Sequence, residues 1–407
     1  MNMKTINPRR NKYRSKPKNL MLTSIVLLGV FSLSVHAQPL AKQDKNNPSI
    51  DALQQRVNQL EQLIELRLLE LDEQIIGATP TKSNIHFGGY GELHYNHLEQ
   101  AGKDFRQLDL HRWVLFVGYN FNDRARLVTE LEVEHVLVSG GGRGAVELEQ
   151  AYIEFNIKKS MQLQVGVILT PLSIINETHE PPTFYGVERP VIETTIIPTT
   201  WYVTGAKFSQ QFDNGVTYDL MVSEGLKTQD PNVNPSAEPF NLKLGKQKGS
   251  FADAFNLAMT VRVSYRGAAG LEISGYAQYQ PDIDQSAQNS YADAAVLVGG
   301  HAIIQRGAFT SKILYADWTL DGSAAETAEK HHQYGGYVEL SWKPNRQWSA
   351  FFRQNQWSQT AGVNASQSDF GVNYYPYENI VFKADYQLQN ADAGDADGFN
   401  LGMGYLF

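Results

Sequence analysis

The strongest constraint on the fold is a series of about sixteen short segments with a period of two, which fills the chain from residue 85 to its end. In each segment apolar and polar side chains alternate, which indicates a β-strand with one apolar face. The connections alternate strictly in length: 122–123 and 158–160 are short, whereas 99–104, 170–200 and 360–366 are longer. Tight turns on one rim, longer loops on the other and an even strand count are typical of transmembrane β-barrels. We therefore predict an all-β fold, an antiparallel transmembrane barrel of 16 strands.

The polar faces of these strands carry charges of both signs. In the segment 125–138 the apolar side chains share one face, and the other face holds Arg126, Glu130, Glu132 and Glu134. Burying many ionised groups in a small dry core would cost far too much free energy. We therefore expect them to line a wide, water-filled lumen, which sixteen strands are enough to enclose.

Residues 1–37 have the features of a secretory signal peptide. Seven basic residues and no acidic residue precede or flank the start of an apolar run, which ends at the small-residue site Val35-His36-Ala37. A twin-arginine signal at residues 8–10 and an anchoring helix are alternatives. The first is disfavoured because a barrel crosses the inner membrane unfolded, the second because the run is only about 16 residues long. Removing seven positive charges changes the formal net charge from −8 to −15, so no nucleic-acid binding is expected.

Residues 50–76 change to a helical period. Apolar side chains recur there at spacings of three and four, with polar residues between them. A heptad-like apolar stripe with nothing in its own chain to cover it favours a coiled coil. A helix that lies on the barrel or in its mouth is the alternative. We expect residues 38–80 to form a periplasmic α-helical coiled-coil segment with a linker, and residues 81–407 to form the barrel.

No catalytic motif stands out in the sequence. The absence of cysteine excludes a disulfide framework, a thiolate metal site and a cysteine nucleophile. The nearest approaches to a metal site are Glu177, His179 and Glu180, and the pair His331-His332. Neither has the i, i+4 spacing of a zinc protease, and both lie in predicted loops. We expect no enzymatic activity, no cofactor and no bound metal.

Two parts of the sequence resemble known outer-membrane proteins. The last strand ends in Phe407, as do the closing strands of bacterial outer-membrane barrels, whose terminal Phe is read by the barrel assembly machinery. The stretches EQAYIEF (149–155), QVG (164–166) and TPL (170–172), with the closing GYLF, resemble the phosphate-selective porin O/P family of trimeric sixteen-stranded channels. The resemblance covers about residues 85–407. It implies a homotrimer in the outer membrane of a Gram-negative bacterium, in contact with its lipid, with a third loop that folds into the lumen and constricts it.

That third loop is 170–200, and loops this long in a compact domain are usually functional. Its charged candidates for the constriction are Arg189, Glu177, Glu180, Glu188 and Glu193. On the wall, strand parity places basic side chains in the lumen at Arg126, Lys207, Arg262 and Lys383, and less directly at Arg112 and Arg353. The same parity places acidic side chains there at Glu130, Glu132, Glu134, Glu154, Glu272 and Glu339.

These charges favour a general porin over a sharply selective one. Arg189 is the only Lys or Arg of the loop, so the lysine cluster of phosphate-selecting family members has no counterpart in it. A lumen with both signs of charge gives weak ion selectivity. We therefore predict passive diffusion of small hydrophilic solutes or ions, including anions such as phosphate. A true phosphate or polyphosphate channel is one alternative, and an anchor whose coiled coil tethers the outer membrane to the cell wall is the other.

Overall fold

The computed structural model describes residues 84–100, 102–137, 144–230, 238–286, 291–391 and 395–407. The predicted signal peptide and coiled-coil segment lie outside the described residues. Within these ranges, none of the helices has the length and apolarity that a membrane crossing requires.

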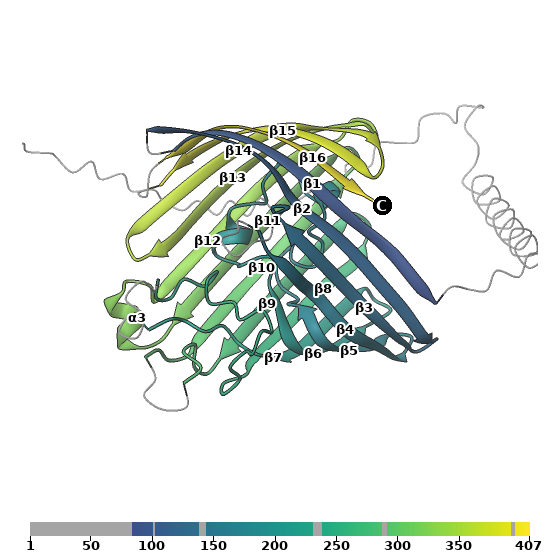
Figure 1. Ribbon diagram of the computed structural model, residues 1–407, viewed down its shortest axis with the longest axis vertical. Coiled ribbons are helices and arrows are strands. Elements are labelled where there is room, and N and C mark those ends of the chain that lie inside the picture. Colours follow the sequence, from purple (N-terminus) through teal and green to yellow (C-terminus); the bar gives the residue numbers. More distant parts are fainter. Residues whose placement is uncertain (1–83, 101, 138–143, 231–237, 287–290, 392–394) are drawn as a thin grey trace, which may run out of the picture. The chain divides into compact units, whose positions relative to one another are not determined.

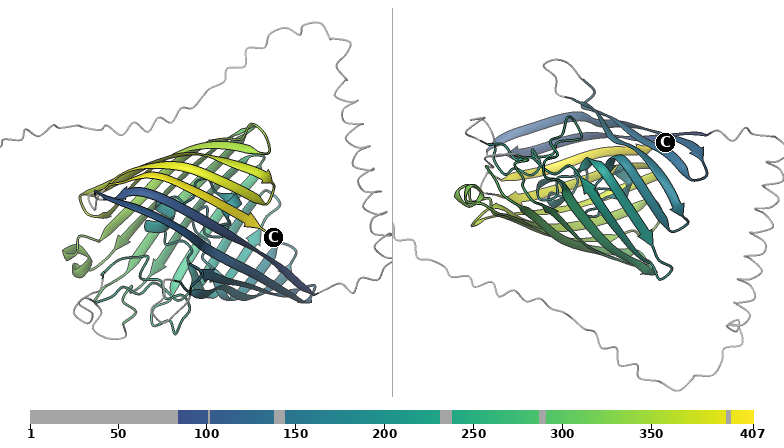
Figure 2. Two further views of the ribbon diagram at one scale, coloured as in Figure 1. Left: turned by 45° about the horizontal axis from the view of Figure 1, so that its top comes forward. Right: turned by 90° about the horizontal axis from the view of Figure 1, so that it is seen from below.

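Sixteen antiparallel strands close into a barrel, in which every strand pairs with its neighbours in sequence and β1 pairs with β16 (Figures 1 and 2). The strands are β1 (Ile85–Gln100), β2 (Lys103–Asn122), β3 (Ala125–Glu134), β4 (Val146–Lys158), β5 (Met161–Leu169), β6 (Tyr202–Gln211), β7 (Val216–Ser223), β8 (Ala258–Ala268), β9 (Leu271–Gln280), β10 (Ala295–Arg306), β11 (Phe309–Leu320), β12 (His332–Trp342), β13 (Trp348–Thr360), β14 (Val363–Tyr377), β15 (Ile380–Asn390) and β16 (Ala396–Leu406). The predicted all-β barrel of sixteen antiparallel strands is confirmed.

The carboxyl terminus closes the barrel against the first strand. The N–H of Phe407 donates to the carbonyl oxygen of Gly89 (2.9 Å), and the N–H of Gly89 donates to the carbonyl oxygen of Phe407 (3.0 Å). This exchange continues the β1–β16 pairing to the last residue and leaves no open sheet edge there.

The predicted alternation of faces is clear in β15. Phe382 and Leu388 are exposed on the outside, whereas Lys383 and Asp385 between them are buried on the inside. An apolar outer surface over a polar interior is the arrangement that a lipid environment requires of a barrel.

Two connections are much shorter than the sequence indicated. The expected loop 99–104 is reduced to residues 101–102, and the expected loop 360–366 to Ala361 and Gly362. In the first case the polar residues extend the strands instead, because Glu99 pairs with Asp104 in the β1–β2 register. Positive φ angles at Gly102 (73°) and Gly362 (78°) make both tight turns accessible.

Several longer loops of that rim fold inward, and their described residues pack with the inner wall into an apolar core. The loop 170–200 carries two short helices, η1 (Pro181–Thr183) and α2 (Ile192–Thr195), and α3 (Ser323–Thr327) lies between β11 and β12. A buried cluster joins loop residues to the inner wall, and its members include Ile192, Ile196, Ile197, Trp201, Leu226, Phe240, Ile283, Leu297, Leu314 and Trp318.

The expectation of a wide, water-filled lumen is therefore wrong for the side formed by β9–β12. Residues 313–316 of β11 show the reason, because this stretch is apolar on both faces. Ile313 and Tyr315 face outward and are exposed, while Leu314 and Ala316 face inward and are fully buried. An inner wall of this composition needs an apolar partner, and the loops supply it.

Candidate functional site

The loop 170–200 lies inside the barrel and is attached to the wall formed by β13 and β15. Lys383 Nζ donates to the carbonyl oxygens of Phe184 (3.0 Å) and Gly186 (2.7 Å). Asp385 Oδ2 accepts from the N–H of Val187 (2.5 Å). These wall groups bind the loop backbone, so they fix its course through the lumen.

A second attachment lies on β6 and β8. Glu177 forms ion pairs with Lys207 (2.7 Å) and with Arg262 Nη1. Arg262 also pairs with Asp219 of β7 (2.7 Å). Although burial opposes ionisation of Glu177, the charges of Lys207 and Arg262 lower its pKa to about 2. The loop is thus held from both sides of the barrel.

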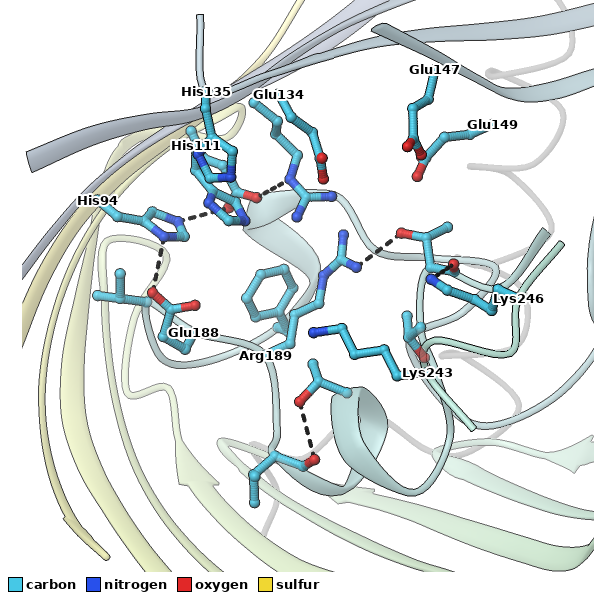
Figure 3. Close-up of a pocket in the computed structure, with 18 of the residues that line it drawn as sticks. His94, His111, Glu134, His135, Glu147, Glu149, Glu188, Arg189, Lys243 and Lys246 are labelled. Atoms are coloured by element: carbon cyan, nitrogen blue, oxygen red, sulfur yellow. Dashed lines mark hydrogen bonds and ion pairs between the residues drawn. The ribbon is translucent and has the colours of Figure 1, made fainter. Parts of the chain in front are cut away.

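A polar cavity of about 630 Å³ lies between the loop and the wall (Figure 3). Its basic lining residues are Arg112, Arg189, Lys243, Lys246 and Lys248. Its acidic lining residues are Glu92, Glu134, Glu147, Glu149 and Glu188. In Figure 3, Arg189, Lys243 and Lys246 reach into the cavity from one side and Glu134, Glu147 and Glu149 from the other, so a field crosses it.

Arg189 is the loop residue with the most free hydrogen-bonding capacity. Its Nη1 donates to Thr200 Oγ1 (2.9 Å). Its Nε and Nη2 are shielded from solvent and have no hydrogen-bond partner among the described residues. Because those two donors are shielded from solvent, Arg189 acts on a solute in the cavity through its positive charge rather than through hydrogen bonds from Nε and Nη2.

The four loop glutamates have different surroundings. Glu188 lines the cavity and accepts from His94 Nδ1 (3.0 Å) and Asn96 Nδ2 (3.0 Å). Glu193 is fully buried and accepts from Tyr337 Oη (2.7 Å) and from the N–H of Ile175 (2.8 Å), so it organises the loop itself.

The other two loop glutamates, Glu177 and Glu180, are not among the cavity's lining residues. Glu177 makes the ion pairs described above. The carboxylate of Glu180 has no hydrogen bond or ion pair within the part of the chain that the structure describes.

The basic wall residues predicted by parity do face the interior, but each has a partner. Arg126 Nε pairs with Glu154 (2.8 Å), Arg112 Nε with Glu92 (2.6 Å) and Arg353 Nε with Asp369 (3.3 Å). Of the basic and acidic wall candidates, the cavity is lined by Arg112 and Glu134. The structure therefore brings together acid–base pairs rather than a track of free cations.

His179 does not join Glu177 and Glu180, although the sequence places the three close together. It lies 3.4 Å from both Glu130 and Glu149, two buried wall carboxylates. Burial alone would lower its pKa, but the close contacts with these two carboxylates outweigh burial and raise it to about 10. His332, in the other histidine pair, contacts Asp317 (3.0 Å).

Sequence reasoning missed two groups of cavity residues. Lys243, Lys246 and Lys248 come from the loop after β7, and their clustering in the stretch 242–248 was a usable signal. The histidines His94, His111 and His135 also line the cavity. No local pattern in the sequence joins these three positions.

Comparison with known proteins places this geometry in a fold class. No known family profile matches the chain. A relative from Aquifex aeolicus, described as an uncharacterized protein, is 28% identical over 359 residues, covering 80% of each chain.

Among solved structures, the outer-membrane channel DcaP of Acinetobacter baumannii has a TM-score of 0.55 at 12% identity, over 79% of this chain and 97% of that one. An anion-selective porin from Comamonas acidovorans also has a TM-score of 0.55, at 10% identity, over 80% and 100%. Salmonella typhi OmpF, in complex with daunomycin, has a TM-score of 0.52 at 13% identity, over 79% and 97%. The chain therefore has the fold of outer-membrane porins.

Proposed function

We propose that this chain is an outer-membrane porin through which small hydrophilic solutes and ions diffuse passively. One observation carries the proposal. The loop 170–200 crosses the interior, is attached to the wall at β6, β8, β13 and β15, and borders a polar cavity with charges of both signs. A fixed constriction with polar walls inside an apolar-surfaced barrel is what a diffusion channel requires.

The charge balance of the cavity supports weak ion selectivity. Five Lys or Arg residues and five Glu residues line it. Four of these form two ion pairs, Arg112 with Glu92 and Lys248 with Glu147, and within each pair the charges neutralise each other. Arg189 and the lysines of residues 243–248 attract anions, while Glu134, Glu147 and Glu149 attract cations. Phosphate would be one permeant among several rather than a strongly bound one, because the glutamates on the opposite side of the cavity oppose the attraction of Arg189, Lys243 and Lys246.

The zero-current potential of the purified protein in a planar bilayer under a KCl gradient tests this function. We expect stable conductance with a weak ion preference, and no block of the chloride current by added phosphate. A strong anion preference with phosphate block would favour the phosphate channel. Correctly folded barrels with no conductance would contradict the porin proposal. They would favour the alternative in which the barrel is an anchor that tethers the outer membrane to the cell wall.

A matched pair of variants tests whether the cavity is the permeation path. Replacing Lys243, Lys246 and Lys248 by Gln should shift the selectivity several-fold toward cations. Replacing Lys158 and Lys159 by Gln removes charge from a turn of the opposite rim and should leave it unchanged. Equal shifts from the two changes would mean that ions do not pass the cavity.

The oligomeric state and assembly belong to the same proposal. We expect a homotrimer, as in the family that the sequence resembles, and recognition of Phe407 by the barrel assembly machinery. Mass measurement in detergent tests the trimer, and deletion of Phe407 should lower the amount of folded barrel in the outer membrane.

A further inference from the structure

Three potential metal ligands meet beside the cavity, away from the loop that constricts it, and two of them, His111 and His135, line it. Asp109 and His111 belong to β2, and His135 follows the end of β3. Asp109 Oδ2 lies 2.7 Å from His135 Nδ1 and 3.3 Å from His111 Nδ1. One ligand atom from each residue lies within 4.8 Å of the other two. Figure 3 shows the two imidazoles side by side at one end of the cavity.

A β-bulge brings His111 into this position. In the β1–β2 register Glu92 faces Arg112 and Leu93 faces Leu110, so His111 is the extra residue. Two consecutive side chains, His111 and Arg112, therefore both line the cavity. Bulges redirect side chains in this way and are common beside functional sites.

His135 reaches the cavity by a related departure from the strand. It has a φ angle of 52°, in the left-handed region that a non-glycine residue adopts at some cost. Its N–H donates to the carbonyl oxygen of His111 (3.1 Å), which ties the two histidine backbones together. Glu134 and His135 consequently line the cavity as another consecutive pair.

The His111 ring is also fixed in orientation. It stacks on the ring of His94, with centroids 4.6 Å apart and planes 11° from parallel. His94 is itself engaged by Glu188 (3.0 Å) and Glu92 (3.2 Å), so it supports His111 and is not a further ligand.

The spacing of the three groups suits a transition-metal ion. Zinc binds His nitrogen and carboxylate oxygen at about 2.0–2.2 Å in tetrahedral geometry, which sets neighbouring ligand atoms about 3.3 Å apart. The two separations from Asp109 Oδ2, 2.7 and 3.3 Å, lie below or at that value, so side-chain adjustment alone can reach it. The three side chains are between 15% and 32% exposed, so an ion can enter from the cavity and keep a water molecule in an open position.

A second cluster, Glu130, Glu149 and His179, has the right residue types but not the same chemistry. All three residues are buried, and the pKa of His179 is about 10. A proton therefore occupies the nitrogen that a metal would need. The pairs His97–Asp104 and His332–Asp317 each offer one histidine and one carboxylate, which is one ligand fewer than the cluster of Asp109, His111 and His135.

We propose that Asp109, His111 and His135 form a binding site for a divalent transition-metal ion, of the Zn²⁺, Co²⁺, Ni²⁺ or Cu²⁺ class, on the cavity wall. Two imidazoles and one carboxylate are the ligands that these ions prefer over Mg²⁺ or Ca²⁺. The site does not depend on the porin proposal, because it is defined by side chains of the folded barrel.

Titration of the purified full-length chain in detergent with Co²⁺, followed by its visible absorption, tests the site. We expect one Co²⁺ per barrel with a spectrum of low-symmetry nitrogen–oxygen coordination, and displacement by Zn²⁺ but not by Mg²⁺. His135→Gln and Asp109→Asn should each weaken binding at least about tenfold. His332→Gln, which removes an exposed histidine of a simple pair, is the matched control and should bind as the unmodified chain does.

A wild-type barrel that shows no Co²⁺ spectrum, or one in which H135Q and D109N bind as tightly as the wild type, would overturn the proposal. The wild-type titration decides even where a variant fails to fold. Because the readout is spectroscopic, its failure is distinct from a failure of channel activity in the bilayer.

Discussion

The two sides of the barrel interior hold the same loop by different means. On the side of β9–β12 the wall and loops form an apolar core, in which Trp318 and Trp201 are almost fully buried with ring centroids 6.1 Å apart. On the side of β1–β4 the wall carries paired charges, such as Arg112 with Glu92 and His179 with Glu130. One side excludes water, and the other borders the polar cavity.

This difference separates stability from permeation. Full burial of an aliphatic or aromatic side chain stabilises by roughly 1.5–3 kcal/mol, whereas many charge pairs contribute little net free energy after desolvation. The apolar side therefore contributes most to holding the loop. The ion pairs contribute less to that attachment, and the charged side also sets the electric field that a solute meets in the cavity. Four predictions test this division, in order of decreasing expected effect.

The largest effect is expected from Trp318→Ala on the apolar side. The change leaves a cavity beside Trp201 and removes the hydrogen bond from Trp318 Nε1 to the carbonyl oxygen of Ile196 (3.0 Å). We expect a loss of about 3–5 kcal/mol, seen as a lower unfolding temperature and faster hydrogen exchange in residues 192–200. Trp342→Ala, on the exposed outer surface, is the control. Equal exchange in the two variants would mean that the core does not hold the loop.

The sequence predicted one of these two sides far better than the other. Strand parity placed Glu130 and Glu132 of β3 inside, where both are buried, because a period of two fixes facing wherever a strand is regular. It missed His111, because a single bulged residue shifts parity locally without any signal in composition.

The apolar side was missed for a different reason. A strand such as β11, apolar on both faces, reads as an ordinary hydrophobic segment, and nothing local tells whether lipid or a loop covers each face. The positions of Lys243 and Lys246 depend on how a long loop crosses the interior. That path is set by tertiary packing, so residue spacing along the chain does not encode it.

The second prediction concerns the ionic attachment of the loop. Glu177→Gln leaves Lys207 and Arg262 without their shared carboxylate partner. We expect a loss of about 2–3 kcal/mol in denaturant unfolding, below the 3–5 kcal/mol of a fully buried pair because Glu177 is 28% exposed. Glu180→Gln, on the same loop, should change the free energy of unfolding by less than about 0.5 kcal/mol. A change as large at Glu180 would show that the ion pairs are not the cause.

The third prediction is the pH dependence of loop attachment. The pKa of His179 is raised from 6.5 to about 10, so its contribution is fully present below pH 6.5 and is lost as pH rises through 10. The pKa of Glu177 is lowered to about 2, so its contribution is present above 4.5 and is lost as pH falls through 2. Stability should therefore be greatest between about pH 4.5 and 6.5.

His179→Gln separates the two limbs of that profile. It should remove the alkaline loss and leave the acid limb in place, when the unfolding temperature is followed from about pH 2 to about pH 11. His332→Gln, at an exposed site, should keep both limbs. If the alkaline limb persists without His179, the ion pairs with Glu130 and Glu149 do not anchor the loop.

The smallest effect is expected at Lys246, on the charged side of the cavity. Burial, helped by the neighbouring charge of Lys248, lowers the pKa of Lys246 to about 8, and its Nζ donates to the carbonyl oxygen of Thr200 (2.8 Å). The cavity should therefore lose one positive charge as pH rises through 8, and bilayer selectivity should shift slightly toward cations. Lys246→Met should abolish this step. Lys243→Met removes a charge but leaves Lys246 in place, so the step should remain. A step that survives in K246M would assign the titration to another group and would weaken the distinction between a side that holds the loop and a side that selects.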